Sequence, residues 1–250
     1  MNAIALYVVL VVFVATLIRS TFGFGEALVA VPLLALRIPI QVAAPLAVLV
    51  SITVAAIVIV QDWRDVHVRS AGWLVLATLA GIPVGLWLLT RVDPRVVKAI
   101  LATTILLFAV YSLTNRVPLH LHRDKLSWLL GCGLLAGVLG GAYGMNGPPL
   151  AVYGSLRRWS ATQFRATLQA YFLPASIIGM AGYWLAGLWV SLVTHYYWLS
   201  LPGTLLATLL GRVLNRRMPE RGFQRYVYGG LIVVSVVLLV QALARPSDGG

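Results

Sequence analysis

The sequence predicts an all-α fold: a polytopic transmembrane helical bundle made of two repeats. Of its 250 residues, 60% are hydrophobic and only 10% are charged, whereas a soluble domain carries about 25% charged residues. A membrane-spanning helix needs about 20 mostly apolar residues. Stretches of about that length or longer without Asp, Glu, Lys or Arg recur along the chain, at 38–61, 70–90, 126–156, 166–211 and 226–244.

We predict five apolar segments in each half of the chain. The first two segments of each half are too short to cross a membrane completely. In the first half these segments are 3–18, 27–36, 41–61, 71–90 and 96–115. In the second half they are 126–139, 147–156, 163–187, 190–211 and 224–243. We therefore expect a first repeat at 1–115, a basic connector at 116–125, a second repeat at 126–243 and a tail at 244–250. Segment 3–18 has no basic region before it and no small-residue cleavage pattern after it, so we expect it to be retained.

Two stretches rich in Gly and Pro interrupt the apolar sequence at corresponding places in the halves. They are residues 20–26 (STFGFGE) and 140–149 (GGAYGMNGPP), and Gly144 follows Gly23 by 121 positions. Such interruptions at matching positions point to the substrate site of a transporter. Non-helical backbone at membrane depth is tolerated only where it is buried in protein or lines a cavity. The alternative, close helix packing through small residues, suits lone glycines such as Gly81, Gly85 and Gly131 better than it suits Asn-Gly-Pro-Pro.

Sequence identities at the same offset support a duplication of the chain. Among them, Ala15, Gly23 and Arg37 correspond to Ala136, Gly144 and Arg158. If each short pair of segments enters and leaves on one side, the repeats are inverted; if each pair is one broken crossing, they run parallel. Lys and Arg gather on one side in both arrangements, so the positive-inside rule does not choose between them. We favour inverted repeats, because four short segments suit half-membrane helices.

The breaks predict a site for a small anion. Half-helices beginning near residues 26 and 147 would aim their N-terminal N–H groups and positive dipole ends at the membrane interior. Backbone and side chains of both breaks are the candidate substrate-binding residues: Ser20, Thr21, Gly23, Gly25, Gly144, Asn146, Gly147 and Pro148. Ser20, Thr21 and Asn146 would add side-chain donors. The expected substrate has several acceptor oxygens.

Charged residues near the breaks are further candidates, because charges inside a membrane are costly and usually functional. Glu26 either carries a coupling proton or complements the dipole of the helix it begins. Arg19 either pairs with Glu26 or extends to an interface, which we favour. Arg165 and Gln169 share one helix face, and both are candidate substrate-binding residues. The alternative for Arg165 is a cytoplasmic positive charge that helps to set the membrane topology.

Several function classes find little support. The net charge of +12 comes from short connections, so no basic module for nucleic acid is expected. The single cysteine, Cys132, lies in an apolar stretch, and the histidines lack ligand spacing, so we expect neither a metal nor a cofactor. No Ser–His or His–Asp arrangement marks a membrane-embedded enzyme, which remains a weak alternative.

At these residues the chain resembles the TauE/SafE family of sulfite exporter-type permeases. The resemblance rests on residues 22–34 (FGFGEALVAVPLL), 144–153 (GMNGPPLAVY) and 164–168 (FRATL). Glu26 and Asn146 depart from the Gly-x-Gly-Gly-Gly that family copies often show. The resemblance implies a bacterial inner-membrane transporter that exports sulfite or an organosulfonate, coupled to protons. Thiosulfate or a small carboxylate is the alternative substrate.

Overall fold

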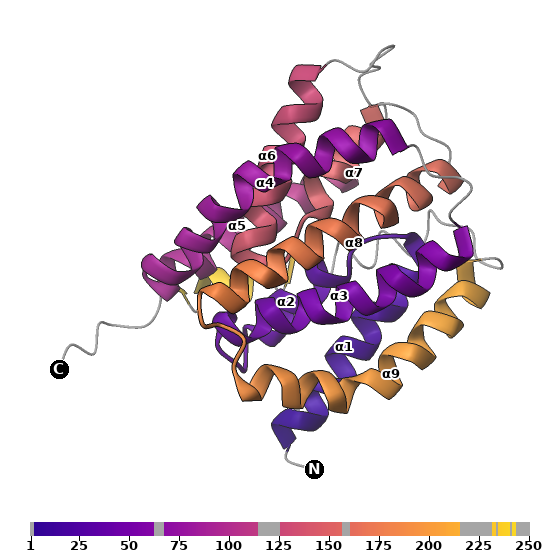
Figure 1. The fold of residues 1–250 in the computed structure, drawn as a ribbon. Coiled ribbons are helices and arrows are strands. Elements are labelled where there is room, and N and C mark those ends of the chain that lie inside the picture. The colour runs from indigo at the N-terminus through magenta and orange to yellow at the C-terminus, as the bar shows by residue number, and fades with distance from the viewer. Residues whose placement is uncertain are drawn as a thin grey trace.

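The computed structural model describes residues 3–62, 68–114, 126–156, 161–215 and, except for 234 and 241, 232–243. Within these residues the chain folds as helices joined by short turns, without strands. Figure 1 shows the bundle. Its helices are α1 (Ala3–Phe22), α2 (Glu26–Leu34), α3 (Ile40–Asp62), α4 (Val68–Arg91), α5 (Pro94–Thr114), α6 (Leu126–Tyr143), α7 (Gly147–Leu156), α8 (Ala161–Leu185) and α9 (Ser191–Asn215), and the described residues of 232–243 are also helical.

The outer faces of the helices are apolar, as is typical of a membrane protein. The helices α1, α3, α4, α5 and α6 are each long and apolar enough to cross a membrane. Large apolar side chains stand on their outer faces, with Leu10 55%, Trp87 60% and Leu107 66% exposed. A soluble protein rarely exposes so much apolar surface, whereas lipid accepts it. The predicted fold class, an all-α polytopic membrane protein, is confirmed.

The predicted lengths of two segments are wrong. Segments 3–18 and 126–139 were expected to be short, but α1 has 20 residues and α6 has 18, so both reach membrane-spanning length. The helix α1 continues through Arg19, and α6 continues through Gly140 and Gly141. The chain then turns at Gly23 and Gly144, whose N–H groups donate to the carbonyls of Arg19 and Gly140. Of the four segments expected to be short, α2, with 9 residues, and α7, with 10, are short. Each half therefore begins with one long and one short helix.

Helices of one half of the chain pack against helices of the other half. The first helix of each half packs along the fourth helix of the other half: α1 along α9, and α6 along α4. Both pairs run parallel, since positions 203 and 211 of α9 approach Phe13 and Ser20, and positions 133 and 141 of α6 approach Ala77 and Ile82. The same pattern in both halves is what a duplication with two-fold symmetry produces.

Glycines allow the backbones of α4 and α6 to touch. A Cβ on Gly81 or Gly137 would lie within 2.9 Å of the Cα of the other, and a Cβ on Gly85 would overlap the carbonyl of Val138. Gly81 and Gly85 are therefore packing glycines, as expected. Gly131 is not, because a Cβ there would meet nothing within 4 Å.

The helices α3 and α8 pack against each other in the middle of the bundle, and they run in opposite directions (Figure 1). Each is the third helix of its half. The short helices α2 and α7 also contact each other. The two breaks, one before α2 and one before α7, are thereby brought together beside α3 and α8.

Candidate functional site

The two breaks depend on glycines in a left-handed backbone conformation. Gly23 and Gly25 have φ of 86° and 102°, and Gly144 has φ of 66°. L-residues with side chains rarely adopt these angles. At Gly144 a Cβ would also lie 2.7 Å from Cγ2 of Val48 on α3. The sequence therefore breaks its helices where only glycine turns the chain without strain.

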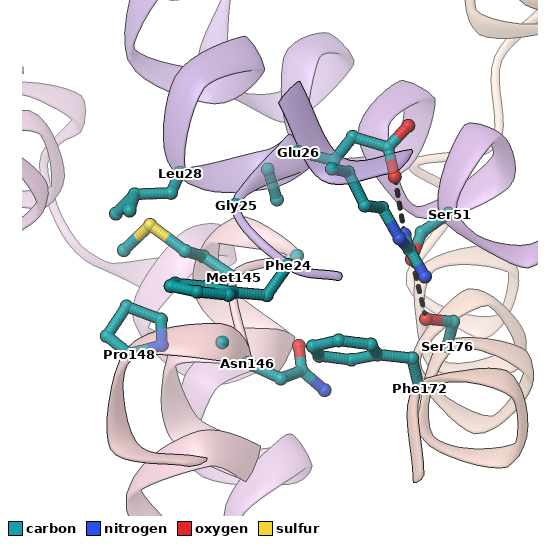
Figure 2. A pocket seen from close by; sticks show the side chains of 14 residues that line it. Phe24, Gly25, Glu26, Leu28, Ser51, Met145, Asn146, Pro148, Phe172 and Ser176 are labelled. Carbon is teal, nitrogen blue, oxygen red and sulfur yellow. Dashed lines mark hydrogen bonds and ion pairs between the residues drawn. The ribbon is translucent and has the colours of Figure 1, made fainter. Parts of the chain in front are cut away.

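One cavity lies between the breaks. It is lined by residues 24–28 of the first break, residues 144–148 of the second, and Arg19, Ser51, Phe172 and Ser176 from α1, α3 and α8. Its empty volume is about 370 Å³, which includes space open to its surroundings. Figure 2 shows Gly25 and Glu26 on one side and Met145, Asn146 and Pro148 on the other. The meeting of both breaks at one cavity agrees with the sequence prediction.

An ion pair lies at the cavity wall. Nη1 of Arg19 donates to Oε2 of Glu26 at 2.5 Å, and each side chain is only 3% exposed. Thr16 donates a second hydrogen bond to the Glu26 carboxylate at 3.2 Å. The expectation that Arg19 extends to an interface is wrong, because its charge is met inside the protein by Glu26.

The Arg19 guanidinium has further partners from both halves of the chain. Nη1 also donates to Oγ of Ser51 at 2.6 Å, and Nη2 donates to Oε1 of Gln169 at 2.9 Å. The Phe172 ring lies 5.0 Å from the guanidinium carbon, where a cation–π interaction is favourable. Ser51 in turn lies 3.3 Å from Ser176. Among the described residues, Nε of Arg19 has no hydrogen-bond partner, so this buried donor is unused.

Asn146 is held by a second polar chain on the far side of the cavity. Its Nδ2 donates to the Tyr171 hydroxyl at 3.2 Å, which lies 2.7 Å from Oγ1 of Thr78. Thr78 then donates to the Gly133 carbonyl at 2.9 Å. The amide of Asn146 occupies space left open by Gly140, where a Cβ would come 2.5 Å from its Oδ1. This chain reaches across α4, α6 and α8 and fixes the amide at the cavity.

The structure brings half of the predicted substrate-binding residues to the cavity, together with Glu26, the predicted proton-coupling residue. Six predicted residues line it: Gly25, Glu26, Gly144, Asn146, Gly147 and Pro148. Gly23 and Gln169 lie behind this wall, where Nε2 of Gln169 donates to the Gly23 carbonyl at 2.8 Å. The side chain of Arg165 lies outside the described residues.

Ser20 and Thr21 do not line the cavity. Ser20 faces α9, where its Cβ lies close to Gly211, and the Thr21 hydroxyl donates to the Leu17 carbonyl at 2.7 Å. Ser51, Phe172 and Ser176 line the cavity and were missed. A serine near the middle of a long uncharged segment, as at Ser51, was the available signal.

The comparison with protein families agrees with this geometry. The family model described as sulfite exporter TauE/SafE matches residues 8–238. The chain belongs to the TauE/SafE family. This match covers both breaks and all of the cavity, so the family-level function, membrane export of sulfite or a related anion, applies to this TauE/SafE protein. Neither the curated proteins nor the solved structures gave a match.

Proposed function

We propose that this TauE/SafE protein is a secondary transporter of the bacterial inner membrane that exports sulfite or an organosulfonate. In this proposal the cavity between the breaks holds the anion and opens to each side in turn, and the transport is coupled to protons. The observation that carries the proposal is a buried cationic side chain, Arg19, at a cavity bounded by both breaks. Buried charge at membrane depth is costly and marks a substrate or ion pathway.

The donors for the anion come unequally from the two breaks. The first-turn N–H groups of a helix have no acceptor within the helix, and residues 26–28 of α2 line the cavity. Gly25, which precedes α2, makes no side-chain cap to them. In α7 two of the first residues are Pro148 and Pro149, which have no N–H. We therefore expect α2, the free donors of Arg19 and the Asn146 amide to bind the anion.

Alternating access around this cavity rests on the symmetry of the bundle. In an inverted duplication, equivalent helices that meet at the two-fold axis run in opposite directions. The antiparallel pair α3 and α8 supports that arrangement over parallel repeats. Transporters with inverted repeats expose a central site to each side by rocking one set of helices against the other. A channel would not need the two breaks to share one cavity.

Glu26, Gln169 and Arg165 have different roles in the proposal. Glu26 carries the coupling proton. Gln169 positions Arg19 and the first break, since it hydrogen-bonds Arg19 and the Gly23 carbonyl and does not line the cavity. Arg165 remains a candidate anion partner on α8 from its place in the sequence alone.

Uptake of labelled anions by proteoliposomes tests this function. Purified protein is reconstituted, and sulfite, an organosulfonate, thiosulfate and a small carboxylate are compared with and without a pH gradient. We expect sulfite or the organosulfonate to be carried fastest and the gradient to change the rate. Equal rates with and without the gradient would refute proton coupling, and fastest transport of thiosulfate or the carboxylate would move the substrate to that class. An anion that is consumed rather than accumulated would indicate an enzyme.

A further inference from the structure

We propose that the Glu26 carboxylate occupies the anion subsite of Arg19 in the empty transporter, and that substrate displaces it as Glu26 takes up one proton. This exchange rests on the proposed function and specifies how the proton and the anion are linked in it. The substrate-free protein would then already contain an anion at the site, supplied by its own chain.

The contacts of Arg19 support such an exchange. Glu26 is its anionic partner, while Ser51, Gln169 and Phe172 are neutral. The neutral partners hold the guanidinium in place from α3 and α8 whichever anion is present. Of the five N–H groups of an arginine, three donate to Glu26, Ser51 and Gln169, and the buried Nε has no partner among the described residues. A second anion therefore finds a donor that Glu26 does not use.

Charge balance makes the proton obligatory. With Glu26 ionised, the buried pair is neutral in total. If an anion joined Arg19 while Glu26 stayed ionised, two negative charges would share one buried cation, which is strongly unfavourable. In the balanced step, the Glu26 oxygen accepts one proton from water as the anion arrives, and it returns that proton to water when the anion leaves. With a monoanion, the site stays neutral throughout.

The ionisable groups around Glu26 leave Arg19 as its charged partner. The helices packed against α2 are α1, α3, α5 and α7. Among their described side chains the ionisable ones are Tyr7 and Arg19 of α1, Arg95, Lys98 and Tyr111 of α5, and Tyr153 of α7, while α3 has none. Tyr7 donates to the Leu33 carbonyl at the opposite end of α2, and Arg95 is exposed. Arg19 is the one that contacts the carboxylate.

The exchange predicts that one proton accompanies each anion in the same direction. A monoanion would then cross without net charge, and a dianion would carry one negative charge. The empty transporter would return with the Arg19–Glu26 pair closed. The pair therefore has two separate tasks: its opening admits substrate, and its closure permits the return of the empty site.

Comparing exchange with net uptake of sulfite tests this inference. Wild type, Glu26→Gln and Arg19→Gln are reconstituted in proteoliposomes, with Asp93→Asn and Arg91→Gln as matched controls at exposed positions near the end of α4 and the start of α5. Glutamine mimics the protonated acid. We expect Glu26→Gln to keep sulfite–sulfite exchange within about twofold of wild type. Its net uptake should fall by at least about 100-fold, because an empty site with an unpaired Arg19 charge cannot return.

The outcomes separate this inference from the proposed function. Arg19→Gln should lose both exchange and net uptake while its melting temperature in detergent shows that it is folded, and the controls should match wild type. If folded Glu26→Gln keeps net uptake, or loses exchange, the exchange mechanism is refuted although the transporter function stands. If wild type carries none of the anions, the proposed function itself is refuted, and the inference with it.

Discussion

Replacing Gly140 by alanine should displace Asn146 from the cavity without unfolding the protein. A Cβ at position 140 would lie 2.5 Å from Oδ1 of Asn146, so the amide must move by about 0.9 Å to reach an ordinary contact distance of 3.4 Å. The hydrogen bond from Asn146 to Tyr171, at 3.2 Å, is then lost. The obstructing atoms belong to a side chain end, so the helix itself need not shift.

The magnitudes predict a functional rather than a structural defect. Losing one neutral hydrogen bond costs about 1 kcal/mol, while alanine in place of glycine in a helix gains up to about 1 kcal/mol. The melting temperature should therefore change little. A hydrogen bond to a charged group contributes about 1.5–3 kcal/mol, so loss of the amide donor should raise the half-saturating sulfite concentration by about 10- to 100-fold.

The assay is sulfite uptake by proteoliposomes across a concentration series, with thermal melting in detergent. Gly131→Ala is the matched control on the same helix, because its Cβ would meet nothing within 4 Å; it should leave uptake unchanged. Asn146→Ala alone should lose as much affinity as Gly140→Ala, and the double variant should lose no more than either. Wild-type affinity in Gly140→Ala, or additive losses in the double variant, would refute this reasoning.

Three further variants test other parts of the structure. Gly137→Ala places a Cβ against the Thr78 carbonyl, a backbone atom that cannot move aside, so it should destabilise the protein by about 1–3 kcal/mol in a denaturation series, and stability equal to that of Gly131→Ala would contradict close packing of α4 and α6. Tyr171→Phe removes the acceptor of Asn146 and should raise the half-saturating sulfite concentration up to about tenfold; an unchanged value would show that Asn146 holds its position without Tyr171. Arg165→Ala should weaken sulfite binding in a titration of purified protein if its side chain serves the anion, and unchanged affinity would leave it a topology charge.

The breaks were predictable because their chemistry is local. Gly23, Gly25 and Gly144 adopt backbone angles that other residues avoid, and two prolines open α7, so composition alone marks both turns. Their meeting at one cavity was expected from their matching positions in the two halves. The lengths of α1 and α6 were not predictable in this way, since a helix continues through an arginine or a glycine pair when neighbouring helices compensate.

The position of Arg19 depends on contacts that are remote in sequence. Its partners Ser51 and Gln169 come from α3 and α8, and the Gln169 contact joins residues 150 positions apart. Without those neighbours, a long basic side chain near a helix end is expected to reach for an interface. The same reason explains why Ser51 and Ser176 were missed, because a serine gains its role only when another helix presents a partner.

The packing of α1 against a helix of the other half also constrains how the protein is made. The partner of α1 is α9, which begins about 170 residues after α1 ends. At a synthesis rate of about 5–20 residues per second, α1 waits on the order of 10–30 s in the membrane for that partner. During this wait Arg19 already has an oppositely charged partner in Glu26, seven residues along the chain. The Glu26 carboxylate can therefore neutralise the arginine charge in the membrane before α9 is synthesised and before any substrate binds.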